Sequence, residues 1–136
     1  MRITNEITQS GMKRIISTTA APGAIGPYSQ AVEANGTLYI SGQVPIDPAT
    51  GKLVEGGITE QTTQALKNIR AILHAAGYTM ENVVKSTCLL SDMSDFKAMN
   101  EVYAQFYTSD QPARAAFAVK GLPLGALIEI ETVAVR

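Results

Sequence analysis

Cysteine and histidine are almost absent from this chain. Cys88 is the only cysteine and His74 the only histidine among its 136 residues. A single cysteine excludes a disulfide within the chain and is typical of a protein from a reducing compartment. One cysteine and one histidine also cannot supply a zinc site of the usual Cys/His kind within one chain.

Long hydrophobic runs and blocks of like charge are missing as well. Lysine and arginine number 11 against 12 aspartates and glutamates, and neither sign is clustered. This balance disfavours a dedicated nucleic-acid binder and a basic membrane-surface protein. No apolar run has the length of a transmembrane helix, and the N-terminus lacks the apolar core of a secretory signal. We therefore expect a cytoplasmic protein with no nucleic-acid or membrane partner.

The length of the chain predicts one domain that can bury a core without disulfide or metal support. Residues 1–11 are polar and lack clear periodicity. We interpret them as an N-terminal extension, and residues 12–136 as a single domain. Two readings of the extension stay open, a disordered arm or a remnant of cloning.

Apolar periodicity and turn signals predict six strands and two helices. Asn35-Gly36 is the strongest turn signal and favours a hairpin with a primed turn. One helix is expected to end at Gly77, and the other to begin with Ser94 as its N-cap. The predicted strands cover residues 14–17, 29–34, 37–41, 83–90, 114–119 and 127–135, and the predicted helices cover residues 59–76 and 94–107. This β-β-β-α-β-α-β-β order indicates an α+β fold, in which two helices can cover only one face of the sheet.

Arg114 is the most informative candidate for ligand binding. If its strand is extended, Arg114, Ala116 and Ala118 share one face, so nothing bulky stands beside the arginine on its own strand. A guanidinium fork suits a carboxylate or phosphate, and the two alanines predict an open floor beside it. The alternative reading is an ordinary solvated arginine on an edge strand.

Glu129 is the second candidate. In the last strand Glu129 and Glu131 share a face with Val133 and Val135, so the carboxylates continue into an apolar row. Desolvation at such a margin raises the pKa of a glutamate toward the range of a general acid or base. The alternation alone leaves open that both glutamates simply face solvent on an edge.

Four short segments, in this order, resemble the reactive intermediate deaminase (RidA) family of small trimeric proteins. The match spans about residues 12–136, and each segment is weak without the others. The segments are Gly26-Pro27-Tyr28-Ser29-Gln30, Ser41-Gly42-Gln43-Val44-Pro45-Ile46-Asp47-Pro48, Pro112-Ala113-Arg114 and the closing Ile128-Glu129-Ile130-Glu131-Thr132-Val133-Ala134-Val135.

The resemblance implies a fold and an activity. The fold is a chorismate-mutase-like α+β sandwich, in which three sheets close into a barrel around a threefold axis. The expected partners are two further copies of the chain, with active sites between subunits. Members hydrolyse reactive 2-enamino and 2-imino acids, such as 2-aminoacrylate, to 2-keto acids and ammonia, and they use no metal and no cofactor.

The resemblance also implies roles for individual residues. Arg114 would fix the substrate carboxylate together with the backbone amides of Gly42 and Ala116. Glu129 would hold and activate the attacking water, while Tyr28 and Ser41 would complete the pocket and assist proton transfer. The family places Asn100 near the substrate as well. Read alone, Gly26-Pro27-Tyr28 is more often a turn with an aromatic lid, and Asn100 a locally bonded helix residue.

One departure from the family pattern bears on function. Many members have a cysteine two residues after the matching arginine, where this chain has Ala116. Cys88 lies in a predicted strand and is most simply a small buried hydrophobe, so it is no evident replacement. The second hypothesis for the chain is a non-catalytic member of the same fold that binds metabolites or acts as a chaperone-like module. A carboxylate beside an anion site favours the enzyme, because it adds nothing to anion binding.

Overall fold

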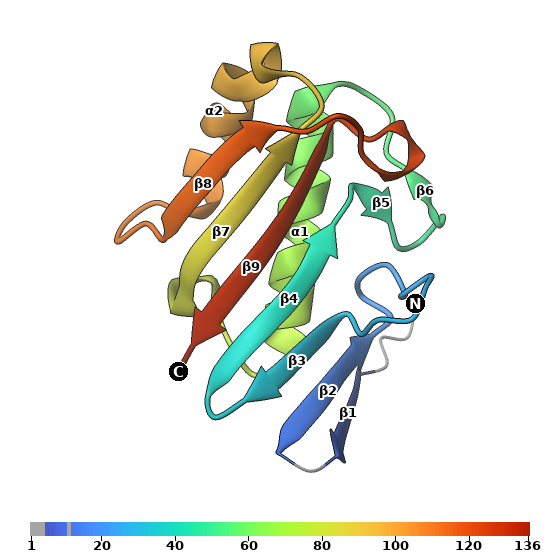
Figure 1. Cartoon of the computed structure of the whole chain (residues 1–136), viewed down its shortest axis with the longest axis vertical. Coiled ribbons are helices and arrows are strands. Elements are labelled where there is room, and N and C mark those ends of the chain that lie inside the picture. The colour runs from blue at the N-terminus through green and yellow to red at the C-terminus, as the bar shows by residue number, and fades with distance from the viewer. Residues whose placement is uncertain (1–4, 11) are drawn as a thin grey trace.

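Seven strands form one mixed sheet, and two amphipathic helices cover one of its faces (Figure 1). The computed structural model describes residues 5–10 and 12–136. In spatial order the strands are β1 (Asn5–Ser10), β2 (Lys13–Thr18), β3 (Ala31–Ala34), β4 (Thr37–Gln43), β9 (Ile128–Val135), β7 (Val83–Leu90) and β8 (Ala113–Ala118). Neighbouring strands run antiparallel, except that β7 and β8 are parallel.

The hairpin predicted at Asn35-Gly36 is confirmed. Asn35 has φ 51° and Gly36 φ 76°, the two positive values that a type I′ turn requires. The turn aligns Ala34 with Thr37 and puts Leu38 and Ile40 on the buried face of β4. Tyr39, one residue out of phase, is exposed on the other face.

Helix α1 (Ile58–Ala75) crosses the sheet over β2, β4 and β9. Ala65, Leu66, Ile69, Ile72 and Leu73 recur at helical spacing and are fully buried. Gly77, with φ 84°, follows the C-cap Ala76, where the left-handed conformation favours glycine. The predicted helix and its glycine stop are therefore confirmed.

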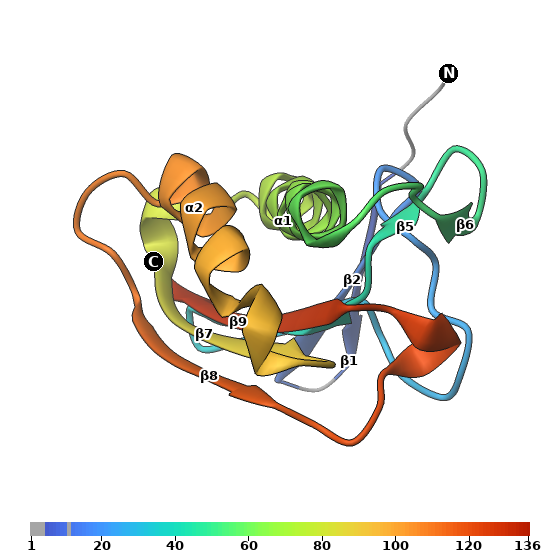
Figure 2. The ribbon, with the colours of Figure 1, turned by 90° about the horizontal axis from the view of Figure 1, so that it is seen from above.

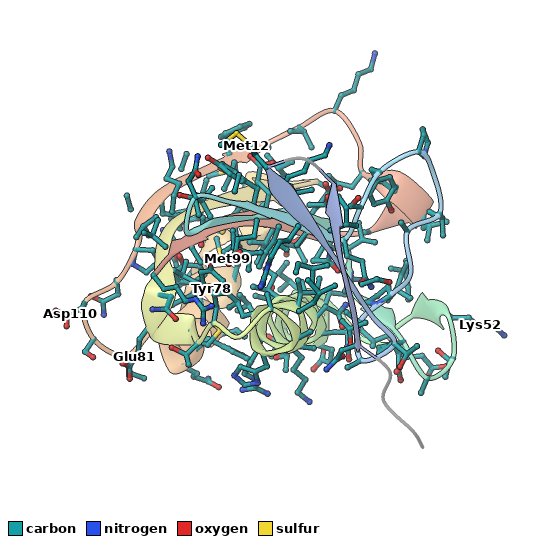
Figure 3. The ribbon with its side chains drawn as sticks, turned by 90° about the horizontal axis from the view of Figure 1, so that it is seen from below. Met12, Lys52, Tyr78, Glu81, Met99 and Asp110 are labelled. Atoms are coloured by element: carbon teal, nitrogen blue, oxygen red, sulfur yellow. The ribbon has the colours of Figure 1, made fainter. Side chains whose placement is uncertain are left out.

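Helix α2 (Phe96–Phe106) begins two residues later than expected, and Ser94 is not its N-cap. A 3-10 turn over Met93–Asp95 precedes the helix, and the Asp92 carboxylate accepts a hydrogen bond from the Ser94 backbone amide at 2.8 Å. Asp92 therefore caps the 3-10 turn, whereas Asp95, the N-cap residue of α2, makes no side-chain capping hydrogen bond. Met99, on the inner face of α2, lies in the interior of the molecule (Figure 3).

Two features have no counterpart in the sequence-based expectation. Strand β1 pairs residue for residue with β2 where only an extension was expected, and Asn5 Oδ1 accepts a 2.5 Å hydrogen bond from Thr18. Residues 1–4 and 11 of the proposed extension lie outside the described residues. A small hairpin, β5 (Ile46–Asp47) and β6 (Lys52–Leu53), occupies the proline-rich loop before α1, with Lys52 at the periphery in Figure 3.

The two faces of the sheet differ sharply. Figure 2 shows both helices on the same side, where they enclose the core. On the other face Tyr39 is 53%, Phe117 48% and Val135 43% exposed. The expectation that two helices leave one face uncovered is thus confirmed. Among the described residues, no helix combines the length and hydrophobicity needed to cross a membrane.

Candidate functional site

The site residues predicted from sequence fall into two groups. Tyr28, Ser41, Gly42 and Glu129 line one cleft of about 430 Å³, which we call the Glu129 cleft. Its wall is completed by the small hairpin at Ile46 and by the turn at Leu124, which has φ 59°.

A β-bulge shapes the floor of the Glu129 cleft. Ile40 pairs with Thr132 and Gln43 with Ile130, so Ser41 and Gly42 together stand opposite the single residue Glu131. A bulge of this kind bends a strand and changes the direction of its side chains. The Glu129 carboxylate lies directly over Gly42, and a Cβ atom there would overlap Glu129 Oε2. Glycine at position 42 is therefore what admits the carboxylate to this place.

Glu129 and Glu131 occupy different environments. Glu129 is half-buried, whereas Glu131 is exposed. Burial, with the neighbouring Glu131 carboxylate as the smaller cause, raises the pKa of Glu129 above its ordinary value. This is the direction expected from the apolar row on β9. A glutamate shifted in this way is a better proton acceptor at neutral pH than an ordinary one.

Ser41 and Tyr28 are held in the cleft by the loop that precedes β3. The Ser41 hydroxyl donates to the Ser29 carbonyl at 2.6 Å. Tyr28 is 49% exposed, and its hydroxyl accepts a long 3.4 Å bond from the Ile25 amide. The loop itself is fixed by Gln30, whose buried amide accepts from the Thr18 backbone at 2.7 Å and donates to the Pro22 carbonyl at 2.8 Å.

Gln30 is a positioning residue that the sequence reasoning did not single out. Its position directly after Tyr28 and Ser29 could have indicated this role. A glutamine next to a Gly-Pro turn can form hydrogen bonds with several backbone groups of the loop.

Arg114 lies in a separate hollow under α2. One of its terminal nitrogens donates to Asn100 Oδ1 at 2.6 Å. Its guanidinium carbon stands 4.9 Å from the centre of the Tyr103 ring and 5.5 Å from that of Phe96. The open floor expected beside Arg114 is therefore wrong in one respect, because α2 covers that face of β8. We call this hollow, lined also by Gln111 and Pro112, the Arg114 niche.

The register shows that the two groups lie on opposite faces of the sheet. Arg114 stands opposite Ser86 on β7, and Ser86 stands opposite Thr132 on β9. Thr132 is three residues from Glu129, so the two side chains point to opposite faces. Within one chain the structure thus brings Tyr28, Ser41, Gly42 and Glu129 together, and Arg114 with Asn100, but it does not join these two sets.

Ala116 and Cys88 are neighbours across β8 and β7. Ala116 packs against the hydrophobic core, and Cys88 is completely buried within it. Burial raises the pKa of the Cys88 thiol to about 11, so the thiol stays protonated at neutral pH. This matches the expectation of a small buried hydrophobe. Among the described residues, no group of three or more histidine, cysteine or acidic side chains could hold a metal ion.

Comparison with known proteins identifies the family. The sequence model of the family described as Endoribonuclease L-PSP matches residues 18–136. The human protein named 2-iminobutanoate/2-iminopropanoate deaminase is 56% identical over 125 residues, which are 92% of this chain and 91% of the human one. This chain belongs to the reactive intermediate deaminase (RidA) family. The resemblance seen in the four short segments is thereby confirmed.

Solved structures agree with the fold. A structure titled a putative endoribonuclease from Thermotoga maritima superposes with a TM-score of 0.90 at 48% identity, covering 92% of this chain and 98% of that one. The structure of Escherichia coli TdcF with bound serine gives a TM-score of 0.86 at 40% identity, covering 90% and 98%. The predicted RidA-type α+β fold is therefore confirmed.

Proposed function

We propose that this protein hydrolyses reactive 2-imino and 2-enamino acids of the 2-aminoacrylate type to 2-keto acids and ammonia. The observation that carries the proposal is Glu129, a half-buried carboxylate of raised pKa that rests on Gly42 at the floor of a ligand-sized cleft. Mammalian relatives of 51% to 57% identity are named 2-iminobutanoate/2-iminopropanoate deaminase, which supports the same reaction.

The complete site, in this proposal, is built by two copies of the chain. The Glu129 cleft offers a base and hydrogen-bonding groups, and the Arg114 niche offers the cation that a substrate carboxylate needs. Because the two lie on opposite faces of one sheet, a second copy supplies the missing half. The exposed face with Tyr39, Phe117 and Val135 gives such copies an apolar surface to bury. A homotrimer closes these contacts around one axis and leaves no heterologous surface open.

Each group then has a definite chemical task. Arg114 of one copy fixes the substrate carboxylate, together with the Gly42 and Ala116 amides. An enamine substrate first takes a proton from solvent on its terminal carbon and so becomes the protonated imine. Glu129 accepts a proton from water as the water oxygen bonds to the imine carbon, which gives a carbinolamine. Glu129 then passes this proton to the amino nitrogen. The C–N bond breaks, and ammonia leaves as the carbinolamine hydroxyl gives its own proton to Glu129 and becomes the keto oxygen; Glu129 finally loses that proton to solvent.

Tyr28 and Ser41 line the same cleft as Glu129 and assist these proton transfers. Imines of this kind already hydrolyse in water, so the protein has to provide only a modest acceleration. One or two groups contributing about 10²- to 10⁴-fold each are enough. No step of this sequence calls for a metal or a cofactor.

Two other functions are less well supported. A non-catalytic binding module of the same fold is not favoured, because relatives above half identity are named as enzymes. A ribonuclease, which the family description suggests, would have to bring a polyanion to a cleft that carries Glu129 and Glu131. With 11 basic against 12 acidic residues, the chain has no surplus charge to offset that repulsion. The reduced, buried Cys88 is consistent with a cytoplasmic location.

An enzyme-linked assay tests the reaction. A serine dehydratase generates 2-aminoacrylate, and the release of pyruvate is followed with and without this protein. We expect the protein to accelerate pyruvate release in proportion to its concentration, and Glu129→Gln protein at the same concentration to do so far less. Pyruvate release at the spontaneous rate, whatever amount of protein is added, would contradict the proposal.

A further inference from the structure

The Arg114 side chain is held entirely by uncharged groups. Asn100 accepts one hydrogen bond at 2.6 Å, and the rings of Tyr103 and Phe96 lie 4.9 and 5.5 Å from the guanidinium carbon. Among the described residues, no carboxylate oxygen lies within 4.0 Å of a guanidinium nitrogen of Arg114. The arginine is therefore fixed in place while its positive charge stays uncompensated.

The three contact residues come from one face of α2. Phe96, Asn100 and Tyr103 are four and three residues apart, the spacing that stacks side chains along a helix. Tyr103 is buried and its ring faces the arginine, whereas Phe96 and Asn100 are only partly buried. The helix thus presents an amide and two ring faces to a single strand residue.

Arg14 shows what a structural arginine looks like in the same protein. Its Nε lies 2.8 Å from Glu33 Oε1, so that charge is neutralised within the fold. Tyr78 adds a 2.5 Å hydrogen bond to the other oxygen of Glu33. Arg114 is also held in one orientation, but by a hydrogen bond and two aromatic rings rather than by an ion pair. An aromatic face attracts a cation but does not cancel its charge toward a second partner.

We propose that Phe96, Asn100 and Tyr103 form a neutral cage that positions Arg114 for the substrate carboxylate. These three are positioning residues, because they act through Arg114. Asn100, expected from the family resemblance to lie at the substrate, acts in this proposal by holding the guanidinium. The inference rests on the proposed function, in which Arg114 is the carboxylate anchor. The cage restricts the orientations of the Arg114 side chain before the ligand arrives. Less side-chain entropy is then lost when the carboxylate binds.

The test measures binding of 2-ketobutyrate by calorimetry together with KM and kcat. Tyr103→Leu and Phe96→Leu each remove one ring, and Tyr103→Phe is the matched control that keeps the ring and loses only the hydroxyl. We expect each leucine variant to raise Kd and KM about 5- to 20-fold, the range of a desolvated cation–π contact. The kcat value should change less than about twofold, because the anchor acts equally before and during the reaction. Tyr103→Phe should bind like the wild type.

A second series, in the Arg114→Ala background, separates positioning from general packing. There the leucine substitutions should change kcat/KM by less than about twofold, because the residue on which the cage acts is gone. An effect of full size in that background would overturn the cage, since it would show damage that does not pass through Arg114. If Tyr103→Leu fails to fold, Phe96→Leu carries the test, because Phe96 is only partly buried.

The outcomes also separate this inference from the proposed function. Arg114→Ala protein that binds 2-ketobutyrate normally would remove the anchor, and the cage with it. If Arg114→Ala loses binding while both leucine variants keep it, only the cage is overturned.

Discussion

The Glu129 cleft and the Arg114 niche hold charges of opposite sign, but in each of them the charged side chain lacks an ion-pair partner among the described residues. In the cleft a half-buried carboxylate has a like-charged neighbour, Glu131, and a pKa raised by burial. In the niche a guanidinium is surrounded by an amide and two rings. Neither charge has an ion-pair partner among the described residues, in contrast to Arg14 and Glu33. Folding alone gains little from isolated charges of this kind, so the difference indicates groups kept for a ligand.

Among the substitutions that test this comparison, Arg114→Ala is expected to have the largest effect on activity. Loss of the bidentate partner of the carboxylate should lower kcat/KM by about 10²- to 10³-fold and abolish most 2-ketobutyrate binding. Arg114→Lys should recover little, because an ammonium lacks the planar fork. The matched control is Arg14→Ala, which should lower the melting temperature by leaving Glu33 unpaired but leave kcat/KM unchanged. Equal kinetic losses in the two alanine variants would contradict the distinction between them.

Glu129 lies on the face of the sheet opposite to Arg114, and Glu129→Gln should separate catalysis from substrate binding. The amide keeps the shape of the side chain but cannot accept the proton of water, so kcat should fall about 10²-fold. Binding of 2-ketobutyrate should be kept or strengthened, because a negative charge near the carboxylate is removed. Steady-state kinetics and calorimetry on the same preparation check both parts. Unchanged turnover would remove Glu129 as the base.

Mixing the two inactive variants asks whether one cleft draws on two chains. Arg114→Ala and Glu129→Gln subunits, unfolded together and refolded in equal amounts, should form mixed trimers. If the anchor and the base come from neighbouring copies, about a quarter of the clefts receive both intact residues, and activity returns to that level. If both residues served one cleft from the same chain, no mixture would regain activity. Sedimentation of the wild type should give the mass of a homotrimer.

Gly42→Ala should displace the Glu129 carboxylate without removing it. A Cβ atom at position 42 overlaps Glu129 Oε2, so the side chain has to turn away from its place over the bulge. We expect kcat to fall about tenfold, between the wild type and Glu129→Gln. Gly23→Ala is the matched control, because Gly23 lines the same cleft and a Cβ atom there meets nothing within 4 Å. A similar loss in both variants would contradict the role given to Gly42.

The parts of the fold that were predictable from sequence are those with strong local signals. Asn35-Gly36 fixed the hairpin, and the apolar spacing of α1 with Gly77 fixed its extent. Strand β1 was not predictable, because its residues show no apolar alternation, although it pairs with β2, the next strand along the chain. The start of the second helix was misplaced. Ser94 is an acceptable N-cap by residue type, but the chain forms a 3-10 turn capped by Asp92 before α2 begins.

Candidate residues for the site could be named from the sequence, but their arrangement could not. Period two correctly put Arg114 and Ala116 on one face of β8, yet it could not tell which face α2 would cover. The separation of Arg114 from Glu129 depends on the pairing of both strands with β7, which no local pattern encodes. The role of Gly42 was likewise hidden, because a bulge appears only when the partner strand is known.

The smallest effect concerns the stability of the fold and its dependence on pH. Because burial raises the pKa of Glu129 in the folded state, the protonated form is favoured by folding. Its contribution to stability is present below the pKa of an unfolded glutamate and is lost as pH rises through the folded value. Ionised Glu129 at neutral pH is therefore slightly destabilising to the fold, as expected for a carboxylate that the proposed reaction uses as a base.

Glu129→Gln should accordingly raise the melting temperature at pH 7 by about 1–3 °C and change it less near pH 4. The activity of the wild type should depend on pH in the opposite sense. The value of kcat/KM falls as pH drops through the raised pKa, because only the carboxylate accepts the proton of water. Glu131→Gln is the control, since Glu131 is exposed and should show a smaller change in stability. An equal rise in melting temperature for both substitutions would mean that the net charge of the protein, rather than the burial of Glu129, causes the destabilisation at pH 7.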